Sequence, residues 1–259
     1  MLLLTTLTPL TLLLAGCRGE GRPQSPPTNG HSMSGASEGL VVSTAAGLLQ
    51  GSKKILSEGG LSVKSWIGIP YAEAPVGPLR FQLPEKKEKW TGVREAFKPP
   101  SCPQSSPFSM KGPSNLTSTD EDCLYLNIYA PGVSESLLPV MIWIHPGGFN
   151  FGSLEDTDPS VLAATRAVIV VTLQYRLGAL GFSLFNKNVS NLGLRDQIVA
   201  IDFVSHNIIN FGGDPTRVTV FGSEVIIIID IKITILLTEK QIRTFRLTKP
   251  SSAIEVFAC

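Results

Sequence analysis

The chain has 259 residues, of which 43% are hydrophobic, so it is long enough to bury the core of one large domain or two small ones. Its formal net charge is only +1, and no run of Lys and Arg stands out. Nucleic acid and an anionic membrane surface are therefore not expected as charge-driven partners.

Residues 1–17, "MLLLTTLTPLTLLLAGC", have an apolar centre that ends in small residues. This pattern is typical of a signal peptide and is too short to span a bilayer, although the usual positively charged start is missing. The end of the segment, Leu14-Ala15-Gly16-Cys17, also fits a bacterial lipobox, in which Cys17 would carry a lipid. We therefore expect a secreted, extracellular or ER-lumenal protein without a transmembrane span. Lipid anchoring through Cys17 is the alternative.

Three more cysteines follow that segment. Cys102 and Cys123 are candidates for a disulfide in an oxidising compartment, which leaves Cys259 as an odd thiol. Two triplets that begin at Asn115 and Asn188 are glycosylation sequons. Such triplets also arise by chance, so they support secretion only weakly.

The composition changes at the start of the globular part. Residues 18–39 are rich in Gly, Pro and Ser and predict a disordered linker. After it, the short apolar runs "LVVST" (40–44) and "GLLQGS" (47–52) predict hairpin strands. Residues 70–115 hold many prolines, which favour extended loops.

Three stronger strand candidates come next. Residues 124–130, "LYLNIYA", alternate between apolar and polar side chains. Residues 139–145 and 167–175 are nearly continuous apolar runs, a pattern typical of strands in a parallel sheet that is covered on both faces.

A helix is predicted roughly over residues 194–209 because apolar side chains recur there at spacings of three and four. These are Leu194, Ile198, Ile201, Val204 and Ile208. The turn residues "NFGGDP" (210–215) end the helix, and "RVTVFG" (217–222) predicts the next strand. Strand, helix and strand in this order indicate an α/β sheet.

Six motifs in the globular part occur in the order of a known family. They are "WIGIPYAEAPVGPLRF" (66–81), "EDCLYLNIYAP" (121–131), "VMIWIHPGGFNFG" (140–152), "VVTLQYRLGALGF" (170–182), "NLGLRDQIVAI" (191–201) and "NFGGDPTRVTVFG" (210–222). Over residues 40–222 the chain resembles the type-B carboxylesterase/cholinesterase family of α/β-hydrolases. The resemblance implies the incomplete N-terminal part of an α/β-hydrolase sheet, with antiparallel hairpins at its start. It also implies the family chemistry, hydrolysis of a small-molecule carboxylic ester through a serine acyl-enzyme.

The resemblance gives the "HPGGF" segment a role in this chemistry. In the family, a glycine-rich loop after a strand points backbone N–H groups at the oxyanion of the tetrahedral intermediate. The matching donors here are Gly147 and Gly148, while Pro146 replaces a glycine that is usual in the family. His145 is expected to support the loop and not to act as a base. The alternative is a tight loop that needs glycine for its conformation alone.

The resemblance also pairs Cys102 with Cys123, which closes a loop of about 20 residues worth roughly 3 kcal/mol in the chain-entropy model. Cholinesterases carry in this loop a tryptophan that stacks on a quaternary ammonium. Here residues 103–122 hold only Phe108 as an aromatic residue, so a choline ester is not the expected substrate.

The family continues from its "VTVFG" strand into a nucleophile elbow, where small residues flank the serine in a strained turn. Here Gly222 is followed by Ser223, which comes one position too early and lies between the bulky Phe221 and Val225. The family triad runs Ser, Asp or Glu, then His along the chain. All three histidines, His31, His145 and His206, precede the elbow position, and the spacing places His206 on the solvent side of its helix.

Residues 223–259 match nothing in the family, so we expect a truncated form that is catalytically inactive because a serine hydroxyl needs an adjacent base. The alternatives are a non-catalytic binding module, as in the neuroligins, or a truncated isoform without function. The truncation would leave the strand 217–222 as an exposed apolar edge prone to self-association, unless residues 225–235 add a substitute strand. No metal or nucleotide motif is recognisable, so no cofactor is expected.

Overall fold

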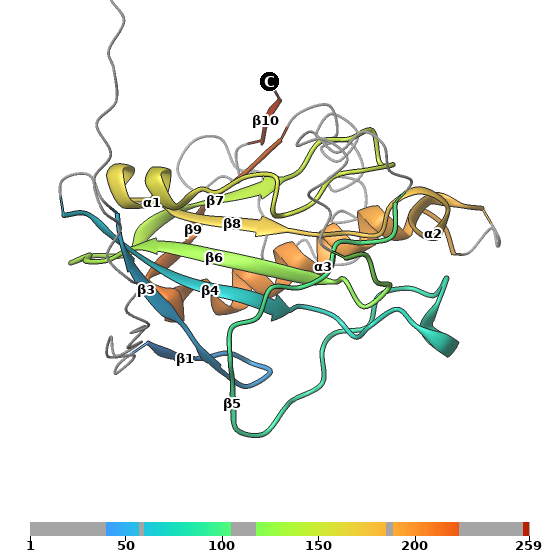
Figure 1. Cartoon of the computed structure of the whole chain (residues 1–259), viewed down its shortest axis with the longest axis horizontal. Helices are drawn as coiled ribbons and strands as arrows, with labels where there is room; N and C mark the ends of the chain where they lie inside the picture. Colours follow the sequence, from blue (N-terminus) through green and yellow to red (C-terminus); the bar gives the residue numbers. More distant parts are fainter. Residues whose placement is uncertain (1–39, 57–59, 105–117, 185–188, 223–255, 259) are drawn as a thin grey trace, which may run out of the picture. The chain divides into compact units, whose positions relative to one another are not determined.

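The computed structural model describes residues 40–56, 60–104, 118–184, 189–222 and 256–258. Two sheets and three short-to-medium α-helices make up this part of the chain (Figure 1). The large sheet contains, in spatial order, β10 (Val256–Ala258), β9 (Gly213–Gly222), β7 (Leu138–Ile144), β8 (Ile169–Leu173), β6 (Tyr125–Pro131), β4 (Ser62–Pro70) and β3 (Ser52–Ile55). The small sheet contains β1 (Val41–Ser43), β2 (Leu48–Gln50) and β5 (Val93–Arg94).

The large sheet is mixed. Strands β10, β9, β7 and β8 run parallel to one another, whereas β6, β4 and β3 extend the sheet from β8 in antiparallel pairs. The helices are α1 (Ser160–Arg166), α2 (Gly178–Phe182) and α3 (Leu192–Asn207), and the 3-10 turns are η1 (Gly77–Leu79) and η2 (Ile208–Phe211). Connections by α1 between β7 and β8 and by α3 between β8 and β9 confirm the predicted α/β class.

Apart from the start of β9, the predicted strands among the described residues agree with the structure to within two residues at each end. The apolar run at 167–175 forms β8, whose five residues are all buried, as expected for a strand inside a covered parallel sheet. The apolar run at 139–145 forms β7, in which buried and half-buried residues alternate. One face of β7 is therefore covered less completely than the continuous run predicted.

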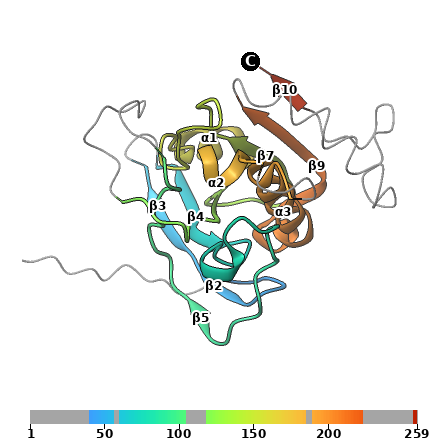
Figure 2. The ribbon, with the colours of Figure 1, turned by 90° about the vertical axis from the view of Figure 1, so that its right-hand side faces the viewer.

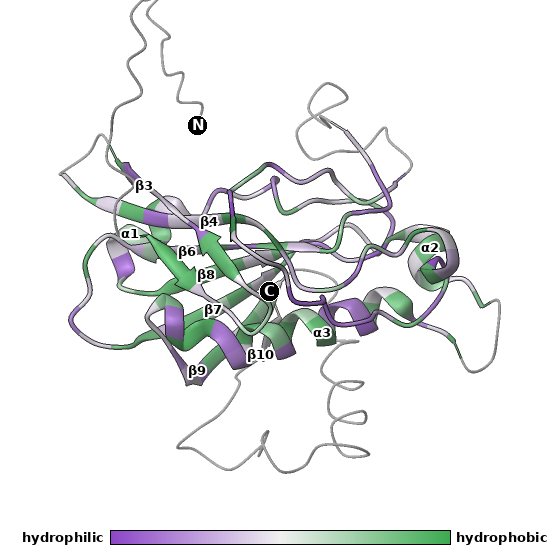
Figure 3. Cartoon of the chain, turned by 90° about the horizontal axis from the view of Figure 1, so that it is seen from below, coloured by the Kyte–Doolittle hydropathy of each residue, from purple (hydrophilic) through white to green (hydrophobic). Residues whose placement is uncertain are grey.

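Helices α1 and α3 cover opposite faces of the sheet. Adjacent strand residues point to opposite faces, and Val170 clusters with Ala163 of α1. On the other face, a methyl group added at Gly213 would meet Ile208, at the end of α3, together with Val140 and Ile169. In Figure 1, α3 is visible behind β6 and β4. Figure 3 shows hydrophilic patches along α3, while β7 and β8 are mostly hydrophobic.

The helix predicted over 194–209 forms as α3 and η2, but its buried stripe differs from the prediction. Ile198 is only half-buried, whereas Asp196, Gln197 and Ala200 have no exposed area. Two of these buried residues are polar, so the apolar periodicity alone does not define the face of α3 that packs on the sheet.

The turn predicted at 210–215 is also only partly correct, because β9 already begins at Gly213. Leu138 of β7 pairs with Gly213, but the next pair is Val140 with Val218, so the register shifts across a bulge. Proline is tolerated at such a bulge because no ladder hydrogen bond is needed from it. The Asp214 carboxylate accepts a hydrogen bond from the Thr216 amide at 2.9 Å and thereby shapes the bulge.

The predicted N-terminal hairpins are present. Strands β1 and β2 pair antiparallel, with Val42 opposite Leu49, and the Thr44 hydroxyl donates to the Gly47 carbonyl in the turn. Strands β3 and β4 form a second antiparallel pair at the far edge of the large sheet from β10 (Figure 2).

At the other edge, β10 pairs in parallel with the last residues of β9, from Val220 to Gly222. The segment predicted as a substitute strand, 225–235, lies outside the described residues. The predicted leader (1–17), linker (18–39) and most of the tail (223–259) lie outside them as well.

Candidate active site

The loop that follows β7 carries the two glycines predicted as oxyanion donors. Gly147 is buried and has φ of +125°, and Gly148 is exposed and has φ of +56°. A Cβ atom at Gly147 would lie 1.9 Å from the carbonyl oxygen of Phe151, so no side chain fits there. The amides of Asn150 and Phe151 both donate to the Gly147 carbonyl, at 2.9 and 3.2 Å, and close the loop into a turn.

The backbone N–H groups of Gly147 and Gly148 donate to no acceptor in the described part of the chain. Most buried backbone donors in proteins are paired, so an unused donor at a buried glycine is unusual. Two adjacent unused N–H groups at the end of a parallel strand can donate hydrogen bonds to a negatively charged group of a ligand.

His145 lies under this loop and has no freedom to act on a substrate. Its ring stacks on Tyr175 with centroids 4.5 Å apart, and Nδ1 lies 3.0 Å from the carbonyl oxygen of Pro146. Burial lowers the pKa of His145, so its ring is neutral near pH 7. This placement agrees with the supporting role expected for His145.

Two other segments anchor the loop through hydrogen bonds. The Tyr175 hydroxyl donates to the His145 carbonyl at 3.2 Å, and the Gly178 amide donates to the Phe149 carbonyl at 2.7 Å. Both donors follow β8. From the segment after Cys102, the Gln104 side chain bonds both the amide and the carbonyl of Gly152.

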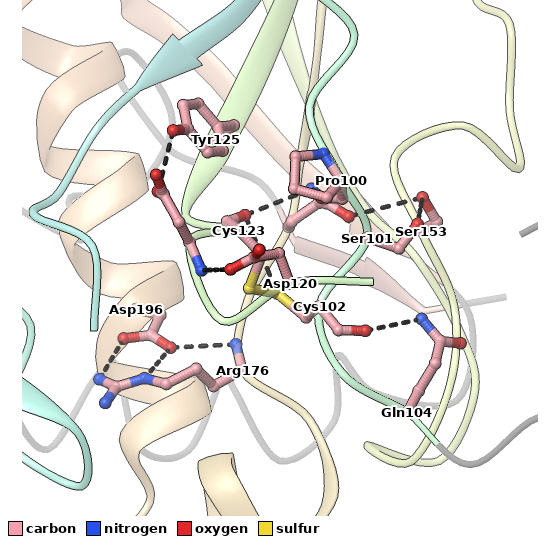
Figure 4. The surroundings of a disulfide bond; sticks show 12 residues. Pro100, Ser101, Cys102, Gln104, Asp120, Cys123, Tyr125, Ser153, Arg176 and Asp196 are labelled. Carbon is pink, nitrogen blue, oxygen red and sulfur yellow. Dashed lines mark hydrogen bonds and ion pairs between the residues drawn. A yellow bond between two sulfur atoms is a disulfide. The ribbon is translucent and has the colours of Figure 1, made fainter. Parts of the chain in front are cut away.

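The disulfide between Cys102 and Cys123 is present, with the two Cα atoms 5.0 Å apart (Figure 4). Buried polar contacts surround it. The Ser101 hydroxyl bonds the Ser153 hydroxyl at 3.0 Å, and the Gln174 side-chain amide donates to the carbonyls of Pro100 and Cys123. These bonds connect the disulfide segment to the loop after β7 and to the end of β8.

A buried ion pair fixes α3 beside the same end of β8. Arg176 donates to both carboxylate oxygens of Asp196, at 2.8 and 2.7 Å, and its backbone amide donates to the same group. Burial raises the pKa of the Asp196 carboxyl, and the bonds from Arg176 oppose that rise. The Arg176 guanidinium also donates to the Gln82 carbonyl at 2.9 Å.

The remaining site residues considered in the sequence lie elsewhere. His206 is exposed on α3, as predicted, with Nδ1 2.7 Å from the Asp202 carbonyl oxygen. Ser223, His31, Phe108 and the two sequon residues, Asn115 and Asn188, lie outside the described residues.

Four polar residues around the loop were not singled out in the sequence. Gln104 and Gln174 bond the loop directly, and the ion pair of Arg176 and Asp196 fixes α3 beside the end of β8. Gln174, Arg176 and Asp196 lie within or beside apolar runs, whereas Gln104 lies among prolines and serines. The buried Asp196 in the middle of a helical apolar pattern was the clearest available signal.

Away from this loop, a hollow of about 240 Å³ lies between α3 and the segment 86–89. Its cations are largely neutralised, since Lys86 pairs with Asp202 and Lys87 with Glu73. Among the described residues, no cluster of His, Cys, Asp and Glu could hold a metal ion, and no helix is long and apolar enough to cross a membrane.

The mixed sheet and the glycine-rich loop at the end of β7 define this part of the chain as an incomplete α/β-hydrolase. A solved structure of a PNB esterase superimposes with a TM-score of 0.64 and 44% identity, over 70% of this chain and 38% of that chain. A thermophilic PNB esterase gives a TM-score of 0.65 at the same identity, over 71% and 38%.

A model of the carboxylesterase family matches residues 38–225. The cocaine esterase of Homo sapiens is 42% identical over 225 residues, which are 82% of this chain and 38% of that protein. The para-nitrobenzyl esterase of Bacillus subtilis (strain 168) is 47% identical over 189 residues, or 70% and 37%. The chain belongs to the carboxylesterase family, and it spans less than two fifths of the length of these relatives.

Proposed function

We propose that residues 40–222 form the oxyanion-binding part of a serine carboxylesterase domain whose substrates are small carboxylic esters. The unused N–H groups of Gly147 and Gly148 carry this proposal. Donors already fixed toward developing charge need no reorganisation during the reaction, and each contributes about 3–4 kcal/mol to stabilising the transition state. Family membership and the names of the relatives support an ester as the substrate.

We expect the 259 residues alone to be inactive as an esterase, because neither histidine of the described residues is placed to activate a serine beside the glycine pair. A serine hydroxyl needs a neighbouring base. His145 is stacked on Tyr175 and faces the Pro146 carbonyl, and His206 is exposed on α3. Ser223 has bulky neighbours, Phe221 and Val225, where a nucleophile elbow needs small residues.

A fluorophosphonate probe, which labels activated serines, tests this inactivity. We expect no labelling of the purified 259-residue chain and no hydrolysis of para-nitrophenyl acetate above a heat-denatured control. The para-nitrobenzyl esterase of Bacillus subtilis serves as the positive control. Labelling of the intact chain at Ser223 would refute the proposed inactivity.

A chimera tests the oxyanion role. Residues 1–222 of this chain would be joined to the remaining C-terminal part of the Bacillus subtilis esterase, which is 47% identical over the matched region. Alanine keeps the backbone N–H, but its Cβ atom collides with the Phe151 carbonyl and must displace the loop backbone. In an active chimera, we therefore expect Gly147→Ala to lower kcat by up to about 10²–10³-fold, the effect of losing one aligned oxyanion donor. Gly92→Ala is the matched control, because Gly92 also has a positive φ of +76° but has open space around it. Equal effects of the two substitutions would argue against the oxyanion role.

The chain matures in an oxidising compartment after removal of residues 1–17 and is exported or retained in the ER lumen. The Cys102–Cys123 disulfide supports this, since stable disulfides are rare in a reducing cytosol. Mass spectrometry of the secreted protein would test the cleavage, a lipid on Cys17, and glycans on Asn115 and Asn188.

A further inference from the structure

The loop after β7 is attached to the disulfide segment at Gly152 through the side chain of Gln104. The Gly152 amide donates to Oε1 of Gln104 at 2.9 Å, and Nε2 of Gln104 donates to the Gly152 carbonyl at 3.0 Å. One side-chain amide thus bonds both polar groups of a single backbone residue, as a neighbouring strand would. This pair of bonds fixes the orientation of the Gly152 backbone as well as its position.

Gly152 in turn packs directly against the start of the loop. It is buried, its φ is +118°, and a Cβ atom added there would lie 2.2 Å from Nδ1 of His145 and 2.5 Å from the Pro146 carbonyl oxygen. Pro146 immediately precedes Gly147. A displacement of Gly152 therefore transmits to the backbone that carries the Gly147 N–H group, because packed backbone cannot absorb it.

Gln104 is itself held by the disulfide. Its Nε2 also donates to the Cys102 carbonyl at 3.1 Å, and Cys102 is bonded to Cys123. Beside it, the Ser101 hydroxyl bonds the hydroxyl of Ser153, the residue after Gly152. The contacts form a continuous path from the disulfide through Gln104 and Gly152 to the glycine pair (Figure 4 shows the disulfide end).

We propose that Gln104 is a positioning residue for the oxyanion loop, and that the disulfide acts on this loop by holding Gln104 in place. Its importance for catalysis rests on the oxyanion role proposed above for Gly147 and Gly148. The positioning itself does not depend on that role and can be measured in the 259-residue chain.

The amides of Asn150 and Phe151 are the reporters for the test, because they close the turn on the Gly147 carbonyl and make no bond to Gln104. In Gln104→Ala we expect their hydrogen exchange to become about tenfold faster, as for a loop that has lost one or two net hydrogen bonds. In a glycine-labelled NMR spectrum, the Gly147 and Gly148 amide signals should also shift. Gln82→Ala is the control, since the Gln82 side chain is exposed.

A second variant, Gln104→Glu, keeps the shape of the side chain and separates positioning from a general loss of stability. The ionised carboxylate accepts from the Gly152 amide but repels the Gly152 carbonyl, whereas the protonated carboxyl can donate to it. Protection of Asn150 and Phe151, corrected for the intrinsic exchange rate, should therefore return as the pH falls through the glutamic acid pKa, ordinarily about 4.3. Gln82→Glu should show no such recovery.

The proposal is overturned if Asn150 and Phe151 exchange at the control rate in Gln104→Ala, or if Gln104→Glu shows no recovery at low pH relative to Gln82→Glu. The two proposals can fail separately. Faster exchange here, combined with no loss of kcat for Gly147→Ala in the chimera, would keep the positioning role of Gln104 and refute the oxyanion role of the loop.

Discussion

At the scale of single residues, Gly147 and Gly148 are neighbours in the loop, but a side chain would meet different surroundings at each. Gly148 has open space around its Cα atom, so an added methyl group there costs only the strain of a left-handed backbone, about 1–2 kcal/mol. At Gly147 the methyl group would also collide with the Phe151 carbonyl oxygen, which belongs to the backbone and cannot rotate away.

We therefore expect Gly147→Ala to lower the free energy of unfolding by on the order of 3 kcal/mol, and Gly148→Ala by about half of that. Urea unfolding followed by tryptophan fluorescence measures both values on the same scale. Equal losses in the free energy of unfolding would contradict the expected collision between the added methyl group at Gly147 and the Phe151 carbonyl oxygen.

The two glycines could be singled out in the sequence because they belong to a short contiguous motif that resembles the family's, and their role as oxyanion donors stays a prediction. The Gln104–Gly152 contact could not, since its partners are 48 residues apart and neither lies in a periodic pattern. For the same reason the roles of Gln174 and Arg176 emerged only from the structure, because each bonds groups far away in the chain.

At the scale of elements, the most consequential contact is the ion pair that fixes α3 to the end of β8. Arg176 has 3% of its side chain exposed and Asp196 has none, so removal of either partner leaves an unpaired charge away from water. Such a loss typically costs 3–5 kcal/mol, far more than the loss of an exposed pair.

Asp196→Ala should accordingly lower the free energy of unfolding by about 3–5 kcal/mol. The control on the same helix is Asp202→Ala, which removes the half-exposed pair with Lys86 and should cost at most about 1 kcal/mol. Circular dichroism during chemical unfolding compares the two variants. A small effect at Asp196 would mean that water reaches the Arg176 guanidinium.

Element type was predictable wherever one apolar pattern dominated a segment, as in the nearly continuous apolar run that forms β8. It was not predictable for α1, which has only seven residues, or for β4, where Gly68 and Pro70 interrupt the strand pattern. The start of β9 was predicted four residues late because its bulge, with Pro215 inside it, has the composition of a turn.

At the scale of the whole molecule, the disulfide joins the segment before β6 to the loops around the candidate site. Its sequence separation is 21 residues, so in the chain-entropy model its removal costs roughly 3 kcal/mol. We expect the Cys102→Ser/Cys123→Ser double variant to lose that amount in urea unfolding. Dithiothreitol should destabilise the wild-type chain by a similar amount and leave the double variant unchanged. An equal effect of dithiothreitol on both would show that other cysteines contribute.

The outer edge of β9 is partly without a partner strand in the part of the chain that the structure describes. Within the described residues, β10 pairs only with Val220, Phe221 and Gly222, so earlier residues of β9 have no partner strand on that side. Unpaired backbone groups on an apolar edge attract a second strand, and a lysine on the edge opposes this. We therefore expect the chain to self-associate as its concentration rises.

Sedimentation velocity over a range of concentrations measures this self-association. Thr219→Lys, on half-buried Thr219 of β9, should shift the distribution toward monomer. Thr165→Lys, on the exposed side of α1, adds the same charge away from the edge and should leave the distribution unchanged. Should both variants weaken association equally, net charge and not edge pairing would be its cause. A wild-type chain that stays monomeric at every concentration would mean that the β9 edge is already covered.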